Sequence, residues 1–213
     1  MTSSHAPSAA RGALVLADIS GYTSFLRSVA SAHRDDAFAD GAVPEAYAIL
    51  SGVLDGIVGS LAPPFTLSKL EGDAVFAYSD ATTSVPRGRD MLDCIETCYA
   101  DFRHRVETAK VVYMCWCDAC SRIDALDLKF VLHAGAFVMQ DIAGQRELVG
   151  PEVVVAHRLL KSRAGELIGH NGYALVTDSA SAAFDIPDDG AAELVETYDD
   201  HRVRAHVFAL RDG

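Results

Sequence analysis

Basic residues are scarce in this sequence. Lysine and arginine number 18 against 30 aspartates and glutamates, which gives a formal net charge of −12 at pH 7. Broad nucleic-acid binding needs a basic surface, so this composition argues against a nucleic-acid partner. The same charge repels any polyanion on average, so a nucleotide would have to arrive with divalent cations or meet a local cluster of basic side chains.

Long hydrophobic runs are also missing. The apolar stretches ALVLADI and VVYMCWC are far shorter than the ~18 residues of a membrane-spanning helix. The opening MTSSHAPSAARGA has no basic stretch followed by an apolar one, so we interpret residues 1–12 as a flexible tail and not as a signal peptide. We therefore expect a cytoplasmic protein with no membrane partner.

Cysteine occurs an odd number of times, five, which does not suit a disulfide framework in a cytosolic chain. Three thiols lie within CWCDAC, a spacing suited to wrapping a metal ion in a loop. One interpretation is a structural zinc site with a fourth ligand from the preceding segment, and the other is a set of reduced, buried thiols. The candidate ligands are Cys115, Cys117 and Cys120, with Cys94, Cys98 or His104 as the fourth.

The hydrophobic pattern predicts helices and strands in alternation. At 213 residues, half of them hydrophobic, the chain is long enough for one domain with a sizeable core. Apolar residues recur at helical intervals from Thr23 to about Leu61, with a break at DDAFADGAVPE that predicts two helices. Further helices are predicted over residues 90–108 and in PEVVVAHRLLKSRAG, which has a proline at its start and Gly165 near its end.

Strands are predicted between these helices. GALVLADI is apolar throughout, as a strand buried on both faces would be. PPFTLSKLEGDAVFAYS predicts a hairpin that turns at Gly72 and Asp73, and LDLKFVLHAGAFVMQDIAG predicts a pair of strands. GYALVTDSASAAF predicts a strand and a short helix, and HRVRAHVFAL a last strand. The class is therefore α/β or α+β with one sheet.

Two aspartates stand where strands are predicted to end. Asp18 ends an apolar run and leads into Ser-Gly-Tyr-Thr, which would present a carboxylate with free backbone N–H groups behind it. Alternatively, Asp18 caps the next helix. Asp73 follows Gly72 at the hairpin turn, four residues after Lys69. Two hard oxygen ligands on adjacent strand ends suit Mg²⁺ or Mn²⁺.

Four motifs together resemble a known family. LADISGYT, KLEGDAVFAY, LKFVLHAG and LVGPEVVVAHRLLKS occur in the order and spacing of the class III nucleotide cyclase catalytic domain. More closely, the chain resembles the DUF2652 branch of that superfamily, in which DISG, GDA, a cysteine cluster and HRLLK come together. The resemblance covers about residues 13 to 210. It implies the ferredoxin-like α+β cyclase fold, with one mostly antiparallel sheet flanked by helices, over residues 13–213, and a cysteine-rich insertion near 111–122.

The resemblance also implies roles for single residues. Asp18 and Asp73 would ligate two Mg²⁺ or Mn²⁺ ions per site, with the Ile19 carbonyl as a further ligand. Lys69 matches the lysine that reads the purine and Glu147 the acid that reads it in adenylate cyclases, which favours ATP. Arg158 matches the arginine that stabilises the transition state. The backbone amides that would hold the phosphates belong to Gly21, Tyr22 and Thr23.

Three positions depart from the family pattern. Val154 stands where the family has the asparagine that orients the ribose, four residues before the arginine. Glu147 has one methylene more than the family's aspartate. The family's phosphate-binding lysine before the last strand has no clear counterpart, and its candidates are His201, Arg202 and Arg204.

Two functions therefore stay open. One is a homodimeric nucleotide cyclase that converts a nucleoside triphosphate to a 3′,5′-cyclic monophosphate and pyrophosphate. The other is a non-catalytic, cyclase-like module that binds a nucleotide or a signalling partner.

Arg158 and His133 also have structural interpretations. Arg158 would be a surface cation paired with Glu152 or Glu166. His133 is interpreted as a histidine with satisfied hydrogen bonds at a strand end.

Overall fold

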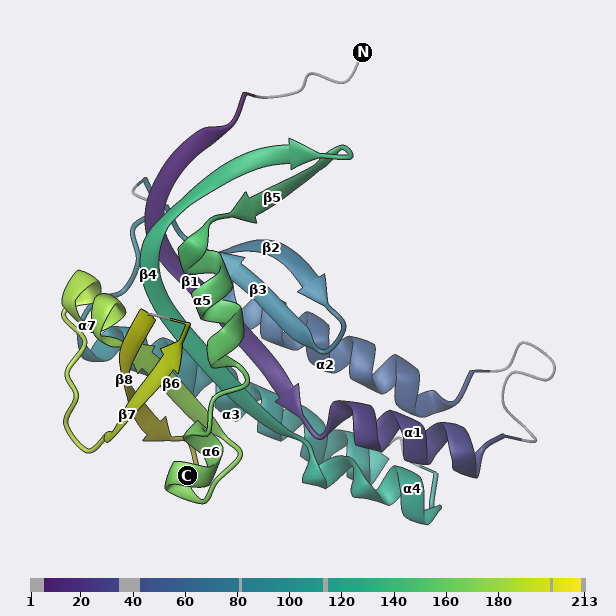
Figure 1. The fold of residues 1–213 in the computed structure, drawn as a ribbon. Helices are drawn as coiled ribbons and strands as arrows, with labels where there is room; N and C mark the ends of the chain where they lie inside the picture. Colours follow the sequence, from purple (N-terminus) through teal and green to yellow (C-terminus); the bar gives the residue numbers. More distant parts are fainter. Residues whose placement is uncertain (1–5, 35–42, 81, 113–114, 200, 212–213) are drawn as a thin grey trace.

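An eight-stranded sheet forms the centre of the fold (Figure 1). The computed structural model describes residues 6–34, 43–80, 82–112, 115–199 and 201–211. The strand order is β2-β3-β1-β4-β6-β8-β7, and β5 pairs with β4 off this path. The strands are β1 (Ser8–Ser20), β2 (Thr66–Glu71), β3 (Ala74–Tyr78), β4 (Asp127–Ile142), β5 (Gln145–Val149), β6 (Tyr173–Thr177), β7 (Ala192–Tyr198) and β8 (His201–Ala209). In these residues only β4 and β6 pair in parallel, so the mostly antiparallel sheet is confirmed.

Helices cover both faces of the sheet. Side chains from α1, α2 and α3 form one core with the sheet, which α7 joins, and those from α5 and α6 form the other. The helices are α1 (Tyr22–Ala32), α2 (Glu45–Leu61), α3 (Arg89–Val112), α4 (Asp118–Ser121), the 3₁₀ turn η1 (Arg122–Ala125), α5 (Pro151–Leu159), α6 (Ala164–Ile168) and α7 (Asp178–Phe184). The α+β class with flanking helices is therefore confirmed. None of the described helices is both long and apolar enough to cross a membrane.

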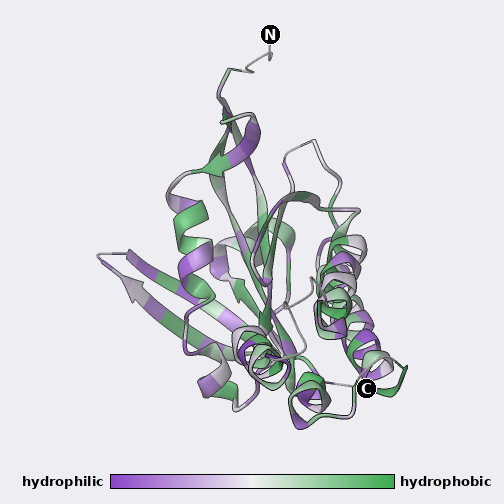
Figure 2. Cartoon of the chain, turned by 90° about the vertical axis from the view of Figure 1, so that its right-hand side faces the viewer, coloured by the Kyte–Doolittle hydropathy of each residue, from purple (hydrophilic) through white to green (hydrophobic). Residues whose placement is uncertain are grey.

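The central strand β1 is buried on both faces, as its apolar run predicts. Ala13, Val15 and Ala17 belong to one core, while Leu14 and Leu16 belong to the other. This alternation is the two-residue period of a strand whose two faces are both covered by helices. In Figure 2 hydrophobic segments concentrate in the central strands, while the helices carry hydrophobic and hydrophilic residues in turn.

The strand β4 is one continuous strand of 16 residues, so the predicted pair of strands is wrong. In the middle of this strand, Gly135 admits the Glu152 side chain of α5, because a Cβ atom at Gly135 would lie 2.4 Å from the Glu152 Cγ atom. The glycine therefore marks a close approach of helix and strand.

Other boundaries also differ from the prediction. The predicted tail reached residue 12, but β1 begins at Ser8, where it already pairs with Met139 of β4. The helix predicted to end near Gly165 ends at Leu159, and the glycine lies inside α6. The strand β7 was not predicted. The two helices α1 and α2 are confirmed, and residues 35–42 of the predicted break lie outside the described residues.

Candidate active site

The two aspartates lie at neighbouring strand ends. Asp18 is the register partner of Ala74 in the β1–β3 pair, and the backbone N–H of Ile19 donates to the Asp73 carbonyl over 3.2 Å. Burial, followed by the charge of Asp18, raises the pKa of the Asp73 carboxyl. The two aspartates thus lie on adjacent strand ends, as the sequence predicts.

A lysine balances part of this negative charge. The Lys129 Nζ atom lies 2.9 Å from the Asp18 Oδ2 atom, with side-chain exposures of 19% and 17%. Lys129 is the register partner of Asp18 across the β1–β4 pair, and its ammonium group also donates to the Leu160 carbonyl over 3.1 Å. Lys129 was not among the predicted site residues, although its place in LKFVLHAG, four residues before the histidine, is a signal that could have found it.

A cleft of about 650 Å³ opens beside Asp18. Its lining residues come from β1, β2, β3, β4 and the α5 region: Asp18, Lys69, Glu71, Ala74, Lys129, Val153, Val154, His157, Arg158, Leu160 and Lys161. Three of the four lysines of the chain belong to this set. On a protein with a net charge of −12, the lining sets four basic side chains against the two carboxylates of Asp18 and Glu71, a local excess of positive charge of the kind that a polyanionic ligand requires.

Lys69 and Glu147, the predicted base-reading pair, are in direct contact. The Lys69 Nζ atom donates to the Glu147 Oε2 atom over 2.8 Å and lies 3.3 Å from the Glu71 Oε1 atom. The hydrogen bond to Glu147 is the largest of the effects that raise the pKa of the lysine. The strands β2 and β5, 78 residues apart at this contact, thus bring together the two side chains that the sequence paired.

The contact network continues into α5 through two residues that sequence analysis missed. The His157 Nε2 atom lies 2.9 Å from the Glu71 Oε2 atom, and its Nδ1 atom contacts the Val153 carbonyl at 2.7 Å. Glu71 lies two residues after Lys69, so both side chains leave β2 on the same face. That spacing is the signal that could have found it.

Arg158 lies on the same helix, and its ion pair differs from both expected ones. Its Nη1 atom donates to the Asp199 Oδ2 atom over 2.8 Å, and its guanidinium lies 5.6 Å from the Tyr198 ring centroid. Neither Glu152 nor Glu166 is its partner. Val154, one helical turn earlier, is 52% exposed and lines the same cleft as Arg158.

The predicted phosphate-binding turn begins α1. Gly21 has a φ of 87° and stands at the N-cap position, directly before Tyr22 and Thr23 in the first helical turn. Burial and the charge of Asp73 raise the pKa of the Tyr22 hydroxyl. The turn and the carboxylate pair are therefore neighbours.

Arg202 is not brought to this cleft within one chain. It lies on β8 and lines a separate cleft of about 280 Å³. His201 and Arg204, the other candidates for a phosphate-binding cation, line that same second cleft.

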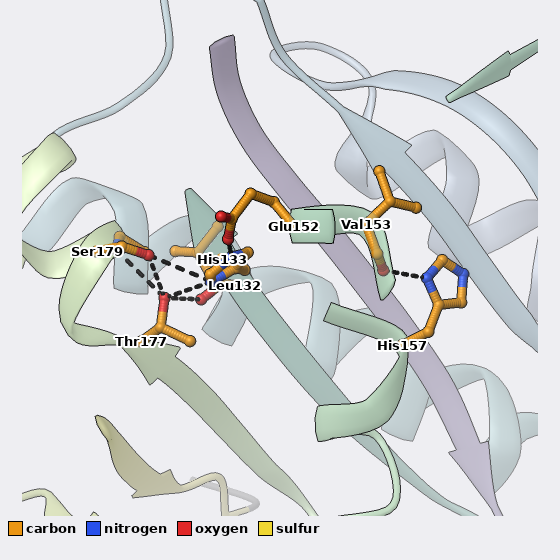
Figure 3. A network of polar contacts seen from close by, with 8 residues as sticks. Leu132, His133, Glu152, Val153, His157, Thr177 and Ser179 are labelled. Carbon is orange, nitrogen blue, oxygen red and sulfur yellow. Dashed lines mark hydrogen bonds and ion pairs between the residues drawn. The ribbon is translucent and has the colours of Figure 1, made fainter. Parts of the chain in front are cut away.

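His133 lies in the same second cleft, at the centre of a polar network (Figure 3). Its Nε2 atom lies 2.7 Å from the Glu152 Oε2 atom, while its Nδ1 atom contacts the hydroxyls of Thr177 at 3.0 Å and Ser179 at 3.2 Å. The histidine is 4% exposed, so the interpretation as a histidine with satisfied hydrogen bonds is confirmed. Its position is the interior of β4 and not a strand end.

The cysteine cluster includes a histidine, His33, that was not among the predicted ligands. The ligand atoms of His33, Cys115, Cys117 and Cys120 all lie within 4.8 Å of one another, so these side chains could hold a metal ion. The predicted fourth ligands Cys94, Cys98 and His104 are not part of this group. Cys98 is buried in α3, its thiol reaches the Ile57 carbonyl, and burial raises its pKa to about 12.

Comparison with known sequences links the chain to one family and one curated relative. The model of the family described as "Protein of unknown function (DUF2652)" matches residues 50–166. The chain is 32% identical over 138 residues, 64% of its length, to the Mycobacterium tuberculosis protein named "Uncharacterized protein Rv2561/Rv2562". The match covers 59% of that relative.

Solved structures of nucleotide cyclases share the fold. The adenylyl cyclase CyaB of P. aeruginosa matches with a TM-score of 0.64 and 12% identity, over 97% of this chain and 98% of that one. A bacterial light-regulated adenylyl cyclase matches with a TM-score of 0.65 and 12% identity, over 95% of this chain and 51% of that one. The catalytic core of a rhodopsin-guanylyl cyclase with converted specificity, in complex with ATPαS, matches with a TM-score of 0.62 and 15% identity, over 97% and 100%.

Proposed function

Because the chain belongs to the DUF2652 family and has the fold of adenylyl and guanylyl cyclase catalytic domains, we propose that it is a nucleotide cyclase. It converts a nucleoside triphosphate, preferably ATP, to a 3′,5′-cyclic monophosphate and pyrophosphate. The observation that carries this proposal is the cleft beside Asp18, which gathers Lys69, Lys129, Arg158 and Lys161 on an acidic protein. A local excess of positive charge favours a polyanion such as a triphosphate.

The carboxylate pair fits a divalent cation. Asp18 and Asp73 offer hard oxygen atoms at neighbouring strand ends, and burial together with the charge of Asp18 raises the pKa of the Asp73 carboxyl. Mg²⁺ and Mn²⁺ are typically bound by one or two carboxylates together with substrate phosphates, which matches a carboxylate pair at the edge of a basic cleft. When bound there, two such ions would lower the pKa of the ribose 3′-hydroxyl and neutralise the leaving pyrophosphate.

The basic side chains then act on the phosphates. Arg158 stabilises the charge that develops on the α-phosphoryl oxygens. Its present partner, Asp199, has a side chain that is 83% exposed, and an ion pair of this kind typically contributes less than about 1 kcal/mol. The arginine can therefore exchange Asp199 for a phosphate at little cost. The backbone N–H groups of Gly21 to Thr23 bind phosphate oxygens at the start of α1.

Lys69 and Glu147 read the base. Their hydrogen bond holds the ammonium and the carboxylate at a fixed separation, so the pair presents a donor and an acceptor together. The edge of adenine, with its amino group and ring nitrogens, complements such a pair. This supports ATP as the preferred substrate.

We further propose that the protein works as a C₂ homodimer with two composite sites. At each site one chain supplies Asp18 and Asp73 and its partner supplies Lys69, Glu147 and Arg158, so the cleft of one chain gives its aspartate to one site and its β2 and α5 side chains to the other. The five cysteines, all within the described part of the chain, form no disulfide bond, which suits a reducing compartment and supports the cytoplasm as the protein's location.

Complementation between two inactive variants tests this proposal. Asp18→Ala and Arg158→Ala should each be inactive alone, because every site in either homodimer lacks one essential group. In a heterodimer one site collects both changes and the other has neither, so co-expression should restore at most about half of the wild-type activity per heterodimer. Heterodimers that form and stay inactive would contradict the shared site.

A second function, a non-catalytic nucleotide-binding module, is favoured by one observation. Val154 places a methyl-bearing side chain in the cleft where the family has an asparagine, and it cannot hydrogen-bond to a ribose. Such a module would bind a Mn²⁺-triphosphate complex without forming a cyclic product. Separate measurements of binding and turnover distinguish the two functions.

A further inference from the structure

The cluster of His33 with three cysteines has the dimensions of a tetrahedral metal site. The His33 Nε2 atom lies 3.6 Å from the Cys115 Sγ atom and 3.4 Å from the Sγ atoms of Cys117 and Cys120. In a tetrahedral zinc site the bonds are about 2.3 Å to sulfur and 2.0–2.1 Å to nitrogen, so the nitrogen and sulfur ligand atoms lie roughly 3.5 Å apart. The distances from the histidine nitrogen to the three sulfur atoms therefore match those of a tetrahedral zinc site, and all four ligand atoms lie within 4.8 Å of one another.

The cysteine segment also has the local hydrogen bond of a thiolate ligand. Cys117 and Cys120 form a C-x-x-C pair, and the backbone N–H of Cys120 donates to the Cys117 Sγ atom over 3.4 Å. Cys117 is thereby the N-cap of α4. A backbone N–H directed at sulfur stabilises its anionic form, which is the form that binds metal.

This cluster lies at the C-terminal end of α1. His33 directly follows the helix, and α4 packs against α1 in Figure 1. At the N-terminal end of α1, a Cβ atom at Gly21 would lie 3.5 Å from a Leu126 methyl carbon and 3.6 Å from the Ala125 carbonyl oxygen. The segment from the cysteines to residue 126 therefore contacts α1 at both of its ends.

The same segment leads straight into the candidate active site. It continues into β4, whose third residue is Lys129, the partner of Asp18. Whatever fixes the cysteine segment against α1 thus also fixes the distance between the turn at Gly21 and the start of β4.

We propose that His33, Cys115, Cys117 and Cys120 bind one structural zinc ion that holds α1 beside the start of β4. Three sulfur ligands and one imidazole are a common zinc set, and four protein ligands leave no open position for substrate. The thiol protons are released to solvent on binding. The ion thereby positions the turn at Gly21. The importance of this turn for phosphate binding rests on the proposed function, whereas the zinc site itself does not.

Zinc content of the purified chain is the first test. Protein purified without chelator should contain about one zinc per chain, and His33→Ala and Cys117→Ser should each lose it. Cys94→Ser is the matched control, because it removes a half-buried thiol that lies outside the cluster, and it should keep the zinc. Metal-free wild type, another metal in place of zinc, or full zinc in His33→Ala would overturn the proposal.

Trp116 provides a direct readout on the intact wild-type chain. It is the only tryptophan, it lies between two of the ligands, and it is 99% exposed. Removing zinc from wild type with a chelator and adding Co²⁺ should produce thiolate-to-metal absorption and quench the Trp116 emission, and added zinc should reverse both. A chelated protein that binds Co²⁺ without either change would contradict ligation by these cysteines.

Hydrogen exchange tests the positioning role. After zinc removal the amides of α1 should exchange about tenfold faster or more, while those of α5 on the other face keep their rates. Unchanged α1 amides, or equal acceleration in α5, would overturn this role even if zinc is bound. Mn²⁺-dependent triphosphate binding should weaken in step with α1 loosening. If α1 loosens and wild type never binds a triphosphate, the proposed function fails and the zinc site stands.

Discussion

Restoring an asparagine at Val154 should increase turnover. The side chain is 52% exposed and lines the cleft one helical turn before Arg158, so its replacement leaves no buried cavity. Exposed substitutions of this kind usually change stability by less than about 0.5 kcal/mol. The change therefore isolates one polar contact to the substrate.

The size of the effect follows from what such a contact contributes. Losing one transition-state hydrogen bond in an enclosed site costs ~10² to 10³ in kcat. Because this position is half exposed, the gain on restoring the contact should fall at or below the low end of that range. We expect Val154→Asn to raise kcat about tenfold to hundredfold, or about 1.4 to 2.7 kcal/mol.

The assay is the initial rate of cyclic nucleotide formation with Mn²⁺ and saturating ATP. Leu167→Asn is the matched control, since it makes a similar change at a 47% exposed position of α6 that does not line the cleft. Its rate should equal that of wild type. If Val154→Asn folds and binds ATP but is no faster than wild type, the assignment of α5 to the ribose and α-phosphoryl group is wrong.

Two further substitutions test the metal and base assignments. Asp73→Asn should unfold at a higher temperature than wild type at pH 7 without metal, because burial and Asp18 raise the pKa of Asp73 and make its ionised form costly in the fold. The higher unfolding temperature of the variant relative to wild type should shrink as the pH falls toward the usual carboxyl pKa of 3.8. Added Mn²⁺ with triphosphate should stabilise wild type alone. A variant less stable than wild type at pH 7 would refute the carboxylate pair. Lys69→Ala should remove most of the preference for ATP over GTP in kcat/KM. The control Lys110→Ala should keep this preference, because Lys110 pairs with Asp124 away from the cleft. A wild type that prefers GTP would refute the assignment of Lys69 to the base.

The sequence predicts most of the fold because its local patterns are strong. The apolar run before Asp18 predicts the central strand, and Gly72 with Asp73 predicts the β2–β3 turn. The pattern fails over residues 126–144, where a pair of strands is predicted and one long strand is found. Gly135 inside that strand makes room for the side chain of Glu152, which lies 17 residues later in the sequence on a helix. No local signal distinguishes a glycine in a turn from a glycine under a packed side chain.

The site is predicted only where the motifs are local or match a family. Lys69 and Glu147 meet as expected, since each lies within a recognisable motif. His33 could not be found in this way, because 82 residues separate it from the first cysteine of the cluster and nothing in its surroundings marks a ligand. Lys129 was missed for a similar reason, as its pairing with Asp18 depends on the register of two long strands.

Turnover of nucleoside triphosphates tests the central claim most directly. Purified wild-type chain with Mn²⁺ should convert ATP, and more slowly the other three nucleoside triphosphates, to 3′,5′-cyclic monophosphate and pyrophosphate in equal amounts, and Asp73→Asn should form neither. A wild-type chain that binds Mn²⁺ and ATP but forms no cyclic product from any of the four would contradict the cyclase assignment and establish the non-catalytic module in its place.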